Sequence, residues 1–122
     1  GGYGFQINED GTGLVASLED VEVLPWNDAM LAASNSTAEG FEDWRLPTLE
    51  ELELMYNTIG QGADNVGGFS TVDYGNYWSS QIYTDYVYEG VEFISVFSFT
   101  TGSSNFYGDA ATYVHTRIIR EF

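Results

Sequence analysis

Residues suited to ligand recognition are concentrated between positions 83 and 109, where tyrosines alternate with acids, amides and serines. A tyrosine ring can stack on the apolar face of a sugar or on a side chain, while carboxylates and amides bind hydroxyl groups. Tyrosine-rich loops on a rigid scaffold are also typical of evolved protein-binding sites. Some of these rings can instead pack beneath their own loops, and we expect about half to be exposed. The sequence therefore predicts a ligand-binding surface composed of Tyr83, Asp85, Tyr86, Tyr88, Glu89, Asn105, Tyr107 and Asp109.

Part of this surface could also bind calcium, because hard cations need only clustered oxygen ligands. The candidate ligands would meet if two neighbouring loops converge, and they are Asp85, Glu89, Asn105 and Asp109. Asn8-Glu9-Asp10 is a second candidate cluster, and a solvated hairpin turn explains it equally well. No EF-hand pattern is present. We expect that no cofactor is required, with calcium as the open alternative.

Catalytic groups are scarce in this sequence. His115 is the only histidine, and it falls in the final strand pattern, where a structural role is favoured. Ser79 and Ser80 have no predictable base partner, and the chain contains no cysteine nucleophile. The glycines at 60–62 and 67–68 lack the lysine of a phosphate-binding loop. Carboxylates are too abundant for a catalytic pair to be recognised. The sequence therefore predicts that the protein is not an enzyme.

The charge balance excludes several classes of partner. The formal net charge is −16, from 19 acidic residues against three arginines and no lysine. Such a surface repels phosphate backbones and anionic lipid headgroups, so nucleic-acid and membrane-surface partners are not expected. No stretch approaches the roughly 20 apolar residues of a membrane span. Most of the acids are expected to form a solvated face, which suits a salty exterior or a medium rich in divalent cations.

The first third of the chain predicts a hairpin followed by a helix. Tyr3–Ile7 alternates like a strand, and Asp10-Gly11 is a strong turn signal leading into a second strand at 14–16. Val21–Leu24 continues as extended chain. Pro25 then suits the first turn of a helix over about 26–34. The buried stripe expected for this helix is Trp26, Met30 and Ala33.

The clearest local signal is a capping box. The Thr48 hydroxyl should accept a backbone N–H, and the Glu51 carboxylate should reach back to the Thr48 N–H. Apolar residues then recur at helical spacing, which predicts a second helix over about 48–57. Gly60 follows as its stop signal.

The remainder reads as one long loop followed by strands. The loop spans 60–75 and is rich in Gly, Asn, Asp and Ser. Strands are predicted at 77–80, 91–99 and 113–122, joined by loops at Tyr83–Gly90 and Thr101–Ala110. This order indicates an α+β fold with two helices on one side of small antiparallel sheets, and with long loops. The length suits a single domain over 1–122, and the Gly-Gly start suggests a domain excised from a larger surface protein.

Several motifs together resemble one bacterial family. Asp43-Trp44-Arg45-Leu46-Pro47-Thr48, followed by Glu50-Glu51-Leu52, is similar to the W-R-L-P-T-x-x-E-L signature of the Legionella collagen-like adhesin C-terminal domain family. Further matches occur in the same order along nearly the whole chain, at Gly11–Val15, Trp26–Ala29, Gly75–Ser80 and Arg117–Arg120.

This resemblance implies a C-type-lectin-like fold, akin to formylglycine-generating enzymes and to retroelement-diversified receptors. It further implies an extracellular module on the bacterial cell surface that binds a glycan or a protein on a target cell. The Trp26-Asn27-Asp28 triplet resembles part of the calcium–sugar site of C-type lectins, but it stands early, and the companion proline motif is absent. The usual calcium–sugar site is therefore not expected.

The signature residues are interpreted as scaffold. Trp44, Leu46, Tyr77 and Trp78 are large apolar groups where helix and sheet should meet. Because cations are so rare here, the arginines are expected to pair with buried carboxylates or backbone carbonyls. The arginines concerned are Arg45, Arg117 and Arg120.

The leading hypothesis is thus an adhesin module that mediates attachment by binding carbohydrate. Two alternatives stay open: a protein-binding receptor tip, which a retroelement could diversify, and a structural module without a ligand. A nearby reverse transcriptase and a repeated 3′ coding end would indicate the first alternative.

Overall fold

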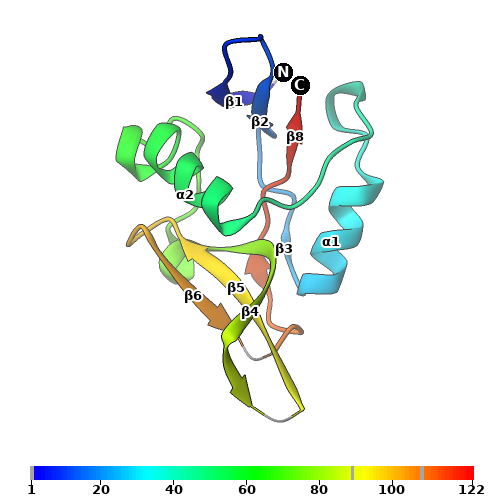
Figure 1. Cartoon of the computed structure of the whole chain (residues 1–122), viewed down its shortest axis with the longest axis vertical. Coiled ribbons are helices and arrows are strands. Elements are labelled where there is room, and N and C mark those ends of the chain that lie inside the picture. Colours follow the sequence, from blue (N-terminus) through cyan, green and yellow to red (C-terminus); the bar gives the residue numbers. More distant parts are fainter. Residues whose placement is uncertain (1, 89, 108) are drawn as a thin grey trace.

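The computed structural model describes residues 2–88, 90–107 and 109–122, without the side chains of residues 73 and 85–88. It is a mixed α+β fold with two small sheets and two α-helices (Figure 1). Both helices have 10 residues. No helix in the described ranges is long and apolar enough to span a bilayer.

A three-stranded sheet of order β1-β2-β8 holds both ends of the described chain. Its strands are β1 (Tyr3–Ile7), β2 (Gly13–Ala16) and β8 (Ile119–Glu121), and all the pairings are antiparallel. The predicted turn is confirmed. Asp10 accepts hydrogen bonds from the Thr12 N–H at 3.0 Å and from the Thr12 hydroxyl at 2.6 Å. The solvated-turn interpretation of Asn8-Glu9-Asp10 therefore accounts for these residues.

The second sheet has the order β3-β7-β4-β5-β6. The strands are β3 (Val23–Leu24), β4 (Asn76–Tyr88), β5 (Val91–Ser98), β6 (Ser103–Tyr107) and β7 (Val114–His115). One pairing is parallel, between Tyr77 of β4 and His115 of β7, so the expectation of purely antiparallel sheets is wrong here. The chain crosses from β6, at one edge of the sheet, to β7 on the far side of β4, and this crossover allows β7 to run parallel to β4.

Both loops predicted in this region contain strand instead. β4 runs through most of Tyr83–Gly90, and β6 occupies much of Thr101–Ala110. Acids and amides favoured the loop interpretation, but the Tyr, Thr, Val and Phe residues between them have high β-propensity and pair with β5. The predicted strand over 113–122 is divided between β7 and β8, which belong to different sheets. The predicted surface loop over 60–75 contains two 3-10 turns, at Gln61–Ala63 and Val72–Gly75, and it buries Phe69.

The first helix, α1 (Trp26–Asn35), begins after Pro25 as predicted. Its buried face is formed by Ala29 and Ala33, whereas Met30 is exposed, which corrects the predicted stripe. Two alanines allow the helix backbone to approach the large rings of Trp44 and Trp78 closely. A methionine at that contact would hold the helix away.

The second helix, α2 (Leu49–Thr58), confirms the capping box at its start. The Thr48 hydroxyl accepts from the Glu51 N–H at 3.2 Å, and Glu51 accepts from the Thr48 N–H at 2.9 Å. The helix ends just before Ile59. At Gly60 an added Cβ would lie 2.8 Å from the Tyr56 Cα atom, so a glycine is needed there for close approach rather than for a left-handed turn.

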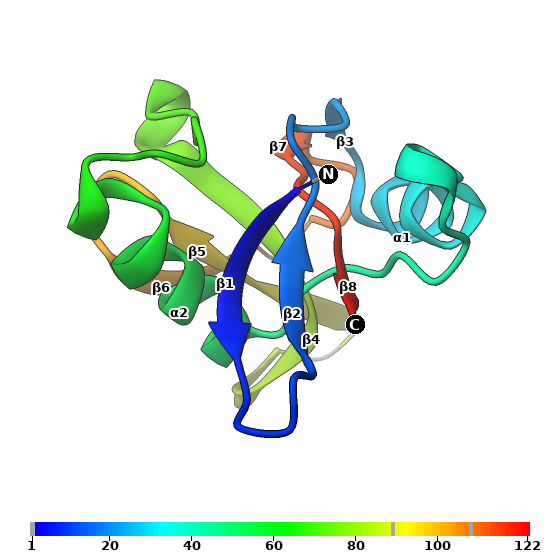
Figure 2. The same ribbon diagram turned by 90° about the horizontal axis from the view of Figure 1, so that it is seen from above.

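The two helices flank the sheets instead of lying on one side (Figures 1 and 2). Successive residues of a strand point to opposite faces, so Tyr77 and Trp78 enter different cores. Tyr77 packs in a cluster with Leu52 and Met55 of α2, whereas Trp78 packs in a cluster with the alanines of α1. This corrects the expected placement of the helices. The predicted scaffold role of Trp44, Leu46, Tyr77 and Trp78 is confirmed, because all four are buried.

Candidate functional site

The predicted ligand-binding residues lie on β4, on β6 and in the segments that follow these strands. The structure describes the side chains of only some of them. Asp85, Tyr86 and Tyr88 belong to β4, but their side chains lie outside what the structure describes, and Glu89 lies outside the described residues. The others are described and are considered next: Tyr83, Asn105, Tyr107 and Asp109.

Tyr83 and Tyr107 lie on opposite faces of the five-stranded sheet. Tyr83 stacks on Phe106, with ring centroids 4.3 Å apart, and Phe93 meets Phe106 edge-on at 5.2 Å. Asn105 and Tyr107 flank Phe106 along β6, so they face the other way. The predicted set is therefore divided, and Tyr83 belongs to a separate aromatic cluster.

Asp109 follows β6, and its side chain stabilises the turn in which it lies. Its carboxylate accepts a hydrogen bond from the Ala111 N–H at 2.9 Å. The carbonyl oxygen of the Asn105 side chain likewise accepts from the Phe106 N–H at 2.9 Å. In the part of the chain that the structure describes, no three His, Asp or Glu side chains are grouped so that they could hold a metal ion. The proposed calcium cluster also requires Asp85 and Glu89, whose side chains are not described.

Asn105 and Tyr107 line a pocket of about 420 Å³ at one end of the β4-β5-β6 sheet, called here the sheet pocket. The other lining residues come from the turn before β4, the start of β4, the end of β5 and the turn before β6. These residues are Tyr74, Asn76, Ser98, Thr101 and Ser103. Among the described side chains that line it, none is charged. In a chain of net charge −16, this neutrality sets the pocket apart from the acidic surface around it.

A hydrogen-bond network fixes the walls of the sheet pocket. The Asn76 amide donates to the Tyr107 hydroxyl at 2.8 Å, and the Tyr107 ring meets Trp78 edge-on at 5.9 Å. The hydroxyls of Thr101 and Ser103 lie 2.7 Å apart and share a hydrogen bond. Side chains held in this way form a preorganised set of donors and acceptors, which reduces the entropy lost on binding.

Sequence reasoning missed the other lining residues of the sheet pocket, and Tyr74 is the aromatic residue among them. Its side chain is 74% exposed, and its backbone has φ = 64°, in the left-handed region that a bulky residue rarely adopts. The Ser98 hydroxyl donates to the Tyr74 carbonyl and helps to hold this conformation. Such backbone strain costs on the order of 1–3 kcal/mol and is concentrated at functional sites. The Tyr74-Gly75 pair before a strand was the available signal, but the segment was interpreted only as a loop.

The signature residues form the scaffold beneath these surfaces. Backbone hydrogen bonds join Arg45 and Ile119 in both directions, at 2.8 and 2.9 Å, so the segment around Arg45 extends the β1-β2-β8 sheet. The Trp44 indole donates to the Ala38 carbonyl at 2.9 Å, and the Pro47 carbonyl accepts from the Ser80 N–H at 2.8 Å.

The sequence profile of the Lcl C-terminal domain matches residues 7–120, which covers nearly the whole chain. The chain belongs to the Lcl C-terminal domain family. The resemblance seen in the motifs is thereby confirmed, and membership indicates an adhesin-associated domain at the cell surface or outside the cell. Membership is consistent with an external binding partner. None of the curated proteins matches the chain.

The three arginines of this Lcl C-terminal domain are all paired, as predicted, although the carboxylate that Arg120 binds is exposed rather than buried. Arg45 donates two hydrogen bonds of 2.8 Å to Glu51, and Arg117 donates to Asp20 at 2.8 Å. Arg120 donates to Asp43 at 2.7 Å and lies over the Phe41 ring. The hydrogen bond from Arg120 lowers the pKa of the exposed Asp43 carboxyl. His115 also has a structural contact, because its Nε2 atom lies 3.0 Å from the Val72 carbonyl.

The Glu51 carboxylate gives the scaffold a pH dependence. Burial opposes its ionisation, but hydrogen bonds from Arg45 and from the Thr48 N–H outweigh burial, so the pKa of Glu51 lies below its usual value. A lowered carboxyl pKa contributes stability that is complete above the unfolded value of about 4.3 and is lost as the pH falls through the folded value.

We expect Glu51→Gln to lower the free energy of unfolding by about 1–2 kcal/mol at neutral pH, because it breaks the capping box and the Arg45 pair. The difference from wild type should shrink below about pH 4. Urea unfolding at pH 7 and pH 3.5 measures both effects. Glu53→Gln, which changes an exposed acid on the same helix, is the matched control. An undiminished difference at pH 3.5 would contradict the proposed linkage.

Proposed function

We propose that the chain is an extracellular carbohydrate-binding module of a bacterial surface adhesin and that the sheet pocket binds the glycan. The observation that carries this proposal is the uncharged lining of Tyr, Asn, Ser and Thr side chains in a chain with 19 acids. Amides and hydroxyls both donate and accept hydrogen bonds, as sugar hydroxyls require. The exposed Tyr74 ring supplies a face on which a sugar can stack.

The charge of the domain restricts the ligand to neutral glycans. Sulfated or carboxylated sugars carry negative charge, and the domain has a net charge of −16 with its three arginines already paired. Long-range repulsion would slow the approach of an acidic glycan, and no unpaired arginine would compensate at contact. Neutral hexose or N-acetylhexosamine polymers are therefore the proposed substrate class.

The proposal includes a C-type-lectin-like fold without catalysis and without a required cofactor. The two flanking helices, and the sheet shared by the first and last strands, support this fold. Direct recognition by hydroxyls, amides and an aromatic ring supports binding that persists without calcium. The paired state of His115 supports a structural rather than catalytic role.

A neutral-glycan array tests the proposal, with the domain applied in calcium and, in parallel, in chelator. We expect binding in both arms. Loss of binding in chelator would instead indicate a calcium-dependent lectin, and no binding in either arm would favour a protein ligand or a structural module. Binding confined to acidic glycans would contradict the charge argument.

The variant Tyr74→Gly distinguishes an effect on glycan binding from an effect on the stability of the fold. Glycine adopts positive φ without strain, so the free energy of unfolding should be unchanged or raised by up to about 1 kcal/mol. Removing the ring should weaken glycan binding about ten-fold, because stacking of this kind contributes on the order of 1 kcal/mol beyond buried area. Calorimetric titration with a glycan found on the array measures the loss.

The matched control for Tyr74→Gly is Tyr113→Ala, which removes a tyrosine with 70% exposure that does not line the sheet pocket. Wild-type affinity is expected for that control. Equal losses in the two variants would overturn the assignment of the glycan to the sheet pocket.

A further inference from the structure

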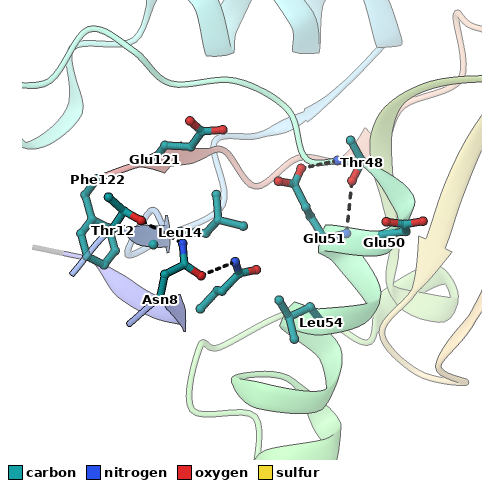
Figure 3. Close-up of a pocket in the computed structure, with 11 residues that line it drawn as sticks. Asn8, Thr12, Leu14, Thr48, Glu50, Glu51, Leu54, Glu121 and Phe122 are labelled. Carbon is teal, nitrogen blue, oxygen red and sulfur yellow. Dashed lines mark hydrogen bonds between the residues drawn. The ribbon is translucent and has the colours of Figure 1, made fainter. Parts of the chain in front are cut away.

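A second groove lies between α2 and the β1-β2-β8 sheet, with a volume of about 800 Å³ (Figure 3). It shares no lining residue with the sheet pocket. We call it the hairpin groove and define it by Asn8, Leu14, Glu50, Leu54, Glu121 and Phe122. The figure shows Leu14 of β2 and Phe122, which follows β8, on one side and Leu54 of α2 on the other.

The floor of the hairpin groove is apolar and rigid. Leu14 is buried in the core, and Leu54 packs against the same core from α2. Phe122 is held in place because its backbone exchanges hydrogen bonds with Gly13, at 2.9 and 3.0 Å. The Phe122 ring also lies close over Gly13, where an added Cβ would be 2.8 Å from the ring. The ring thus lies against Gly13 while 45% of the residue is exposed.

The rim of the groove carries negative charge that the described part of the chain neutralises only in part. Glu50 is exposed in the first turn of α2. The Glu121 side chain is 74% exposed, and its contact with Arg45 is long, at 3.4 Å. Glu51 also lines the groove, but it is already bound by Arg45 and by the Thr48 N–H.

The chain places one cation near this rim, Arg45, whose shorter contacts go to Glu51. It contains no lysine, and its arginines are held by Glu51, Asp20 and Asp43. Glu121 receives only the longer contact of Arg45, at 3.4 Å, and Glu50 has no ion pair among the described residues, so this rim can accept a further positive charge. The apolar floor beside the acids adds a second requirement, because a small hydrated cation would leave Leu54 and Phe122 uncovered.

We propose that the hairpin groove binds a lysine- or arginine-bearing segment of a partner polypeptide. The aliphatic stem of such a side chain covers Leu54 and the Phe122 ring, while its charged head reaches Glu50 and Glu121. The Phe122 ring also offers a face for a cation. This site is independent of the proposed glycan site and would dock the domain on a basic protein.

Amide chemical shifts of the ¹⁵N-labelled domain, titrated with a capped penta-lysine peptide, test this proposal. Shifts are expected at Asn8, Leu14, Leu54 and Phe122. The double variant Glu50→Gln/Glu121→Gln should weaken binding about five-fold, the scale of two partly exposed ion pairs. Leu54→Ala, which leaves the charge unchanged, should weaken binding about two-fold.

The matched control is Glu53→Gln/Glu92→Gln, which removes two exposed acids that do not line the groove. This control should bind like wild type, because only long-range attraction is reduced. An equal loss in the control would reveal non-specific attraction to the acidic surface and overturn the proposal. Equal binding of the same peptide with acetylated lysines would also overturn the proposal. So would amide chemical shifts at these residues that change with protein concentration in the absence of peptide, because they would assign the groove to a second copy of the chain.

Discussion

Replacing Arg117 with methionine is expected to lower the free energy of unfolding by about 3–5 kcal/mol, the usual cost of removing one partner of a buried ion pair. Arg117 is 1% exposed. Its guanidinium donates to Asp20 at 2.8 Å and to the carbonyls of Ser17 and Gly67 at 3.1 and 2.9 Å, and it lies over the Phe69 ring. Methionine fills much of the volume but satisfies none of these acceptors.

The position of Asp20 increases the loss of stability expected for Arg117→Met. Its second oxygen accepts from the Tyr77 hydroxyl at 2.6 Å, so one carboxylate joins Arg117 to the core. Burial and the charge of Asp20 raise the pKa of Tyr77 well above its usual value, so the hydroxyl stays protonated and donates. Without Arg117, the charge on Asp20 has only Tyr77 as a described side-chain partner.

Urea unfolding of Arg117→Met measures this effect, and Arg120→Met is the control. Arg120 pairs with Asp43, an exposed carboxylate, so its replacement should cost about 1 kcal/mol or less. Arg117→Lys keeps the charge but loses the planar set of donors, and it should fall between wild type and methionine. Similar losses of unfolding free energy for Arg117→Met and Arg120→Met would show that burial does not determine how much each ion pair contributes to stability.

Trp78→Ala should have an effect of similar size, about 3–5 kcal/mol, because it empties the centre of the core beside α1. Trp78 has 0% exposure, and its indole N–H donates to the Leu24 carbonyl at 2.7 Å. Its ring also supports Tyr107 in the sheet pocket. The variant is therefore expected to lose glycan binding together with stability.

Trp78→Phe keeps a folded domain available for measurement. It leaves the Leu24 carbonyl without its indole partner and opens a smaller cavity, so a loss of about 1–3 kcal/mol is expected. Trp26→Phe is the matched variant, because Trp26 also donates to a carbonyl, that of Ser79 at 2.9 Å, but is only half-buried. Thermal unfolding should rank Trp78→Phe as the less stable of the two. The opposite ranking would contradict the central place of Trp78.

Features whose hydrogen bonds join residues only a few positions apart could be predicted from the sequence. The capping box joins Thr48 and Glu51, and the first turn joins Asp10 and Thr12. Their geometry depends on residue types at short spacing, so distant parts of the chain do not alter it. Rarity of cations likewise predicted that Arg117 would be paired, although its partner Asp20 is 97 positions away and could not be named.

Features that depend on which strand lies beside which could not be predicted. The polar segments ending at Tyr88 and Tyr107 become strands because each pairs with β5, and pairing overrides the loop-like composition. Similarly, Ala29 is buried and Met30 is exposed, because the space beside Trp44 and Trp78 suits a small side chain.

The sequence alone determined the family, the two helices, the capping box of α2, the hairpin, the acidic character of the chain and the buried role of Trp44, Leu46, Tyr77 and Trp78. Only the tertiary structure decided that the predicted ligand-binding residues are divided between two faces of a sheet and that Tyr74 joins Asn105 and Tyr107 around one pocket. The reason is physical. A pocket is formed by side chains that are distant in sequence, and strand register together with an unusual backbone conformation at Tyr74 sets which of them meet.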